Sequence, residues 1–144
     1  MTEPDGLGLA QLVRDKKVSA LELLEAALER AEKAQARVNC FAALFPDLAR
    51  EQIARGGLKG PYAGVPFVTK DLAAGIKGAP LTGGSRACKD VVSTDDTTLV
   101  KRYREAGLVF FGSTTTPEFG LTLTTESSLY GQTRNPWDCT RIAG

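Results

Sequence analysis

Apolar residues recur at steps of three and four along residues 20–36, with charged residues on the other side of the same stretch. Just before it, Ser19 and Glu22 have the spacing of a capping box, in which each side chain accepts from the other residue's amide. The pattern predicts a helix over about residues 20–36 that packs one face on a core. The expected core positions are Leu21, Leu24, Ala27, Leu28 and Ala31.

Shorter apolar runs predict strands between further helices. Residues 40–45 read as a strand, and Pro46 with Asp47 then opens a helix to about residue 55, which Gly56 and Gly57 end. A connector rich in glycine and proline leads to a second strand over 65–70.

The second half repeats this alternation. The residues 94–96 offer an N-cap to a helix that carries Leu99, Val100, Tyr103 and Ala106 on one face and stops at Gly107. The apolar run 108–111 reads as a strand covered on both faces, which indicates an α/β fold with a buried sheet and helical cover. Residues 116–118 signal a helix start, and the tail from 120 to 144 reads as loop.

Composition adds limits rather than a function. With 144 residues, 42% of them hydrophobic, the chain has the size of one soluble domain. The net charge of +1 gives no field for binding nucleic acid or a membrane, and the oligomeric state is not readable. The N-terminus has no secretory-signal pattern, so a cytoplasmic location is the default expectation. Three widely spaced cysteines, Cys40, Cys88 and Cys139, fit reduced thiols better than a disulfide frame or a metal site.

The chain contains no histidine. A Ser-His-Asp or Cys-His device cannot be assembled within it, and a histidine-rich metal site is excluded too. Lysine is then the natural proton carrier for hydrolytic chemistry, because a desolvated ammonium loses its proton readily.

Lys70 is the lysine of interest, since it closes the predicted strand 65–70 at its carboxyl end. Burial there would yield a neutral amine that could take a proton from a serine. From spacing alone, a strand-end lysine with its ammonium in water is the commoner outcome. The neighbouring Asp71 would oppose the base role as a close partner, so we expect it to turn away and cap a backbone amide in the following loop.

Four ordered blocks resemble the amidase-signature family. They are GPYAGVPFVTKD at 60–71, GGSR at 83–86, EAG at 105–107 leading to TTTPEFG at 114–120, and YGQTRNPWD at 130–138. The resemblance implies an α/β fold whose mixed β-sheet is covered by helices on both sides. It also implies that residues 1–144 are an incomplete signature domain, with an N-terminal helical region at 1–59 and the start of the signature core at 60–144.

The same resemblance implies an amidase that cleaves a linear carboxylic amide through an acyl-serine and a Ser-Ser-Lys triad, without a metal or cofactor. Lys70 would be the terminal base, and both serines would follow residue 144, the first in a Gly-Ser-Ser-Gly-Gly block. A small amide would be the ligand, with Phe119 and Gly120 as candidate substrate-lining residues, although Phe119 fits an ordinary core position equally well. Two alternatives stay open: the A subunit of a glutaminyl/glutamyl-tRNA amidotransferase, and a non-catalytic fragment that retains the fold.

Three details of the last blocks bear on the site. Thr115 stands where the family commonly has asparagine, so a hydrogen bond made by that amide is in doubt. Ser127 and Ser128 precede the YGQTRNPWD block rather than follow it, and we interpret them as loop hydroxyls. The residues 135–138 predict a turn in which Trp137 is buried.

Overall fold

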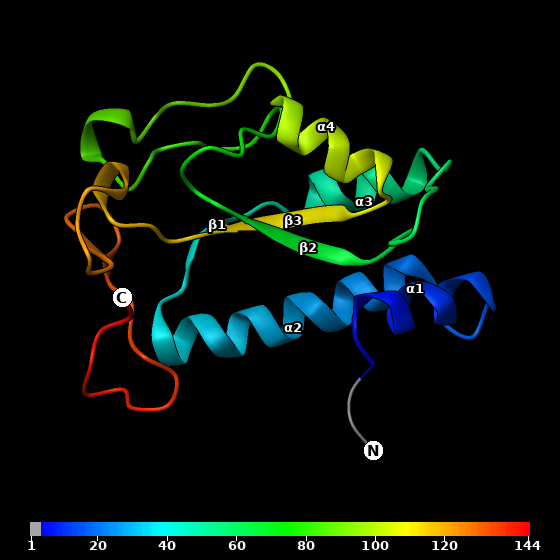
Figure 1. The fold of residues 1–144 in the computed structure, drawn as a ribbon, viewed down its shortest axis with the longest axis horizontal. Coiled ribbons are helices and arrows are strands. Elements are labelled where there is room, and N and C mark those ends of the chain that lie inside the picture. The colour runs from blue at the N-terminus through cyan, green and yellow to red at the C-terminus, as the bar shows by residue number, and fades with distance from the viewer. Residues whose placement is uncertain (1–3) are drawn as a thin grey trace.

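A computed structural model describes residues 4–144 and contains a three-stranded sheet with helices on both sides (Figure 1). The strands are β1 (Phe41–Leu44), β2 (Pro66–Lys70) and β3 (Val109–Thr114), in the order β1-β3-β2. β1 runs antiparallel to β3, whereas β2 runs parallel to it. The expected mixed α/β sheet is therefore confirmed, with β3 at its centre.

The helix α2 (Ala20–Val38) begins where the capping box predicts. Ser19 accepts from the Glu22 amide, and the Glu22 carboxylate accepts from the Ser19 amide at 2.8 Å. A shorter helix, α1 (Gly6–Arg14), precedes it and was not expected, because Gly6 and Gly8 lower its helical propensity. Asp5 caps α1 by accepting from the Gly8 amide.

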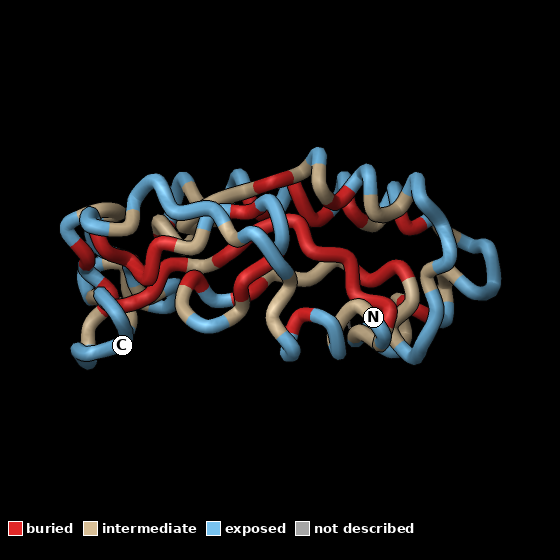
Figure 2. The backbone as a smooth tube through the Cα atoms, turned by 90° about the horizontal axis from the view of Figure 1, so that it is seen from above, coloured by how far each residue is buried: buried red, intermediate tan, exposed pale blue. Residues whose placement is uncertain are grey.

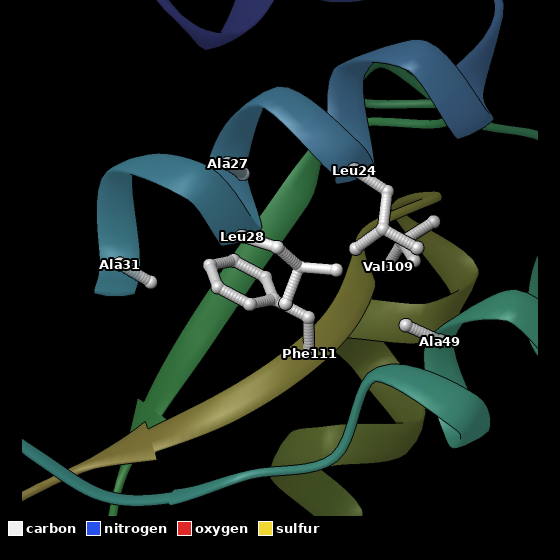
Figure 3. Packing of buried hydrophobic residues seen from close by; sticks show 7 residues of the cluster. All are labelled: Leu24, Ala27, Leu28, Ala31, Ala49, Val109 and Phe111. Atoms are coloured by element: carbon white, nitrogen blue, oxygen red, sulfur yellow. The ribbon is translucent and has the colours of Figure 1, made fainter. Parts of the chain in front are cut away.

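The core has one layer on each face of the sheet. On the α2 face, Leu24, Leu28 and two alanines of α2 meet Val109 and Phe111 of β3 and Ala49 (Figure 3). On the other face, Phe110 packs with Val100, Phe45 and Ile76. Consecutive residues of β3 thus serve opposite layers, as a strand buried on both faces requires. Buried positions run through the middle of the molecule, and exposed positions lie on its outer turns (Figure 2).

The helices α3 (Pro46–Ala54) and α4 (Thr98–Glu105) follow the predicted order, but α4 begins later than expected. Thr97 is its N-cap residue. Asp96 instead binds Arg104 at 2.6 Å and accepts from the Lys77 amide at 2.8 Å. The predicted buried face is wrong at Leu99, which is 43% exposed, and Leu21 of α2 is exposed as well.

Beyond β3 the chain has little regular structure, as predicted. The helix signal at residues 116–118 yields only a single 3-10 turn, η2 (Glu118–Gly120). In this tail, β4 (Glu126–Ser127) pairs with β5 (Gly131–Gln132). Another 3-10 turn, η1 (Arg86–Cys88), lies earlier in the chain, between β2 and α4. Across residues 4–144 no helix combines the length and apolar character needed to cross a membrane. Over the same residues, no group of three or more histidine, cysteine or acidic side chains could hold a metal.

Gly107 ends α4 as predicted, with φ of +96°. A Cβ there would collide with the Lys59 carbonyl oxygen and lie 2.6 Å from the Cα of Ala63. We expect Gly107→Ala to lower the free energy of unfolding by about 3 kcal/mol, from strain plus overpacking. Gly57 is the matched control, because its φ is +72° but no atom lies within 4 Å of the added Cβ. Gly57→Ala should cost about 1 kcal/mol. Urea unfolding measures both values, and equal losses would contradict the packing argument.

Candidate active site

Lys70 is the last residue of β2, at the carboxyl ends of two parallel strands. It pairs with Thr114, the last residue of β3, and the Asp71 amide continues the ladder by donating to the Thr114 carbonyl at 3.0 Å. α/β folds commonly place their sites outside the carboxyl ends of such strands. The structure thus puts Lys70 at the sheet end where the sequence predicts it.

Among the described residues the side chain of Lys70 is exposed, which is the outcome that spacing alone favours and not the burial that a neutral amine would need. Lys70 borders a hollow of about 250 Å³, most of whose other lining residues are apolar. They are Phe67, Val68, Thr69, Leu72, Ala73, Ala74, Leu99 and Tyr103. Among residues 4–144, no carboxylate lies within ion-pair distance of the Lys70 ammonium. The surroundings are apolar, but the described residues do not enclose the amine.

Asp71 turns away from Lys70, as predicted. Its carboxylate is buried and accepts from the Thr82 amide at 2.8 Å, the Thr82 hydroxyl at 2.6 Å and the Gly84 amide at 3.4 Å. The Tyr130 hydroxyl lies 3.4 Å from the same carboxylate and 2.9 Å from the Thr82 hydroxyl. These residues join the end of β2, the glycine turn at Gly83 and Gly84, and the tail after β3 in one buried polar group.

Tyr130 is suited to donate within this group. Burial raises the pKa of the Tyr130 hydroxyl, and the negative charge of Asp71 raises it further, whereas the hydrogen bond with Thr82 lowers it. The net shift is upward, so the phenol keeps its proton at neutral pH. Thr82 and Tyr130 were not singled out from the sequence. The threonine directly before Gly83 and Gly84 is the signal that could have pointed to the first of them.

Phe119 and Gly120 form a tight turn near the same end of the sheet. Both have left-handed backbone angles, with φ of +50° and +70°, and the Phe119 amide donates to the Gly83 carbonyl at 2.7 Å. Phe119 is 48% exposed, so it is not the ordinary core residue that the sequence left open. A Cβ on Gly120 would lie 3.1 Å from Leu72, two residues after Lys70. Leu72 therefore links the two predicted site segments, although Phe119 and Gly120 do not line the hollow beside Lys70.

Two hydroxyls brace the segment that carries Phe119. Thr115 is buried, and its hydroxyl lies 2.7 Å from the Thr133 hydroxyl and 3.3 Å from the Cys40 carbonyl oxygen. Its hydroxyl thus holds the tail against the end of β1. The Ser85 hydroxyl donates to the Glu118 carboxylate at 2.6 Å and accepts from the Ala87 amide, so Ser85 caps the turn that begins at Arg86.

The remaining candidate residues lie in the tail. Ser127 is buried, and its hydroxyl accepts from the Tyr130 amide at 3.2 Å, in a structural role. The turn at residues 135–138 is confirmed, because the Asn135 side chain accepts from the Trp137 amide at 2.9 Å. The predicted burial of Trp137 is wrong for the described residues, since its side chain is 92% exposed.

A mixed sheet covered by helices, with a lysine and polar loops at the carboxyl ends of its parallel strands, defines an α/β protein, and such folds commonly place their sites at that end. The family model called Amidase matches residues 22–144. The chain belongs to this amidase-signature family.

Curated relatives agree with this assignment. The chain is 37% identical over 154 residues to the A subunit of the glutamyl-tRNA(Gln) amidotransferase of Thermobifida fusca (strain YX), covering 100% of this chain and 31% of that protein. It is 36% identical over 143 residues to the 6-aminohexanoate-cyclic-dimer hydrolase of Paenarthrobacter ureafaciens, covering 97% and 28%. The chain thus spans less than a third of each relative's length.

Solved structures show the same fold. A structure of 6-aminohexanoate cyclic dimer hydrolase matches with a TM-score of 0.90 at 34% identity, covering 99% of this chain and 30% of that one. A bacterial aryl acylamidase of the amidase signature family matches with a TM-score of 0.84 at 30% identity, covering 94% and 30%.

Proposed function

We propose that this chain supplies the lysine base of an amidase that hydrolyses a linear carboxylic amide through an acyl-serine intermediate. The observation that carries the proposal is the full GVPxxxKD match at residues 64–71, with Lys70 at the carboxyl end of β2. The family resemblance gives this lysine the role of terminal base in a Ser-Ser-Lys triad. The two serines are expected in a segment after residue 144, so we call the chain together with that segment the full-length protein.

The proposed reaction has two halves. Neutral Lys70 takes a proton from the nucleophilic serine by way of the middle serine, and the serine oxygen bonds to the amide carbonyl carbon. Backbone amides near the nucleophile stabilise the oxyanion. The carbon–nitrogen bond then breaks, the proton passes to the leaving amine, and an acyl-serine remains. Water, deprotonated by the same relay, attacks the acyl carbon, so the carboxylic acid leaves and the serine regains its proton.

The site segments support this proposal through their placement. The apolar hollow beside Lys70 is the kind of surface that desolvates an amine once a further layer covers it. Asp71, the nearest carboxylate in sequence, is held by its own buried donors and leaves the lysine without an acidic partner. We assign Phe119 and Gly120 to the wall of the acyl pocket, because their turn contacts Leu72 and Gly83 next to the strand end.

A second candidate function is that of the A subunit in a tRNA-dependent amidotransferase. The observation that favours it is that several curated relatives at 35–40% identity are named as the A subunit of glutamyl-tRNA(Gln) amidotransferase. The chemistry up to the acyl-serine would be the same. The released ammonia would then pass to a partner protein instead of leaving into the solvent.

Substrate turnover separates the two functions. We expect the purified full-length protein, without any partner, to release amines from simple linear amides, measured by amine detection over a panel of aryl and aliphatic amides. Glutamine serves as the comparison substrate. Release of ammonia from glutamine alone, and only after the other amidotransferase components are added, would overturn the independent amidase and establish the second candidate.

A further inference from the structure

Asp71 is a fully buried carboxylate directly beside an exposed lysine. It is 1% exposed, and none of the ion pairs found among residues 4–144 includes it. A buried carboxylate without a cation is stable only when several donors solvate its charge. Here the donors are the Thr82 amide, the Thr82 hydroxyl and the Gly84 amide, with the Tyr130 hydroxyl at the edge of the group.

Two backbone hydrogen bonds hold the chain around Lys70. The Asp71 amide donates to the Thr114 carbonyl at 3.0 Å, and the Leu72 amide donates to the Lys70 carbonyl at 2.8 Å. The peptide units that follow Lys70 are thus fixed on both sides. Lys70 is exposed whereas Asp71 is buried, so fastening Asp71 inside the group holds the Lys70 side chain outside it.

The donors come from segments that are distant in sequence. Thr82 is 11 residues from Asp71, and Tyr130 is 59 residues away. Thr82 also sets the glycine turn, because its hydroxyl accepts from the Gly84 amide at 3.1 Å, and Gly83 in turn carries the Phe119 backbone. One buried group therefore couples the direction of Lys70 to the position of the predicted acyl-pocket wall.

We propose that Asp71, through the Thr82 hydroxyl, is a positioning residue that directs Lys70 toward the middle serine and leaves the lysine without a carboxylate partner. The inference rests on the proposed function, since it gives Lys70 the role of base. Asp71 itself touches neither substrate nor reacting atoms. It acts on the rate by holding the lysine within the narrow geometry that proton transfer requires.

The test compares Thr82→Val with Thr82→Ser in the full-length protein. Valine keeps the shape and the amide donor but removes the hydroxyl, whereas serine keeps the hydroxyl. We expect Thr82→Val to lower kcat for amide hydrolysis about 10- to 100-fold with KM changed less than about twofold. Thr82→Ser should stay within about threefold of the parent. Asp71→Asn keeps one acceptor and loses the charge, and it should lower kcat as much as Thr82→Val does.

The following outcomes decide the inference and separate it from the proposed function. Equal kcat in Thr82→Val and the parent, with unchanged thermal midpoints, would overturn it, and so would equal losses in the valine and serine variants. If Thr82→Val does not fold, Tyr130→Phe replaces it, because that change removes only the second hydroxyl at Asp71; kcat equal to the parent's would then overturn the inference.

Lys70→Ala is measured in parallel. Retained activity there would overturn the proposed function, whereas an inactive Lys70→Ala beside a normal Thr82→Val would overturn this inference alone.

Discussion

Lys70→Ala in the full-length protein is expected to lower kcat/KM for amide hydrolysis by a factor of about 100 to 10,000, because general base catalysis contributes about 10² to 10⁴. The loss falls on acylation, since without the amine the serine keeps its proton. The fold should survive, because Lys70 is exposed and lies at the end of β2. Steady-state rates with matched circular dichroism spectra measure both effects.

Two control variants sharpen this prediction. Lys70→Arg should not restore activity, because a guanidinium is not deprotonated in proteins and cannot serve as a base. Lys59→Ala removes another exposed lysine and should leave the rate unchanged. Near-normal hydrolysis by Lys70→Ala would remove Lys70 from the mechanism.

The isolated chain of residues 1–144 is expected to show no amide turnover above the uncatalysed reaction. It contains no histidine, and Ser127, which we interpret as a loop hydroxyl, is buried and accepts from the Tyr130 amide. Purified chain of verified mass would be assayed against the same amide panel. Turnover that persists after repurification and disappears in Ser127→Ala or Ser128→Ala would show that the triad has been misplaced.

Signals between residues that are close in sequence predicted where two of the helices begin or end. The capping box at Ser19 and Glu22 fixed the start of α2, and Gly107 fixed the end of α4. The start of α4 was wrong because Asp96, which looked like a cap, is recruited by Arg104 eight residues later. Burial raises the pKa of Asp96, but the hydrogen bonds from Arg104 and the Lys77 amide together hold it below its usual value.

The site was predictable only in part. Asp71 was expected to bond a nearby amide, because a carboxylate beside a base has to be satisfied elsewhere. Its partner Tyr130 could not be inferred, since nothing local connects residues that the fold brings together across 59 positions. Burial of Trp137 was expected from residue type, whereas burial of Lys70 was expected only from the base role that the family resemblance implies. Burial depends on what packs against a side chain, and the described residues leave both side chains exposed.

The most direct test of Lys70 as the base of an acyl-serine mechanism is to locate the acyl group. The full-length protein and its Lys70→Ala variant would be mixed with an activated ester, quenched during turnover and digested, and the modified peptide identified by mass spectrometry. We predict an acyl group on a serine after residue 144, formed at least about 100-fold more slowly in the variant. An acyl group on Ser127, Ser128 or a cysteine, or one that forms at the same rate without Lys70, would contradict this mechanism.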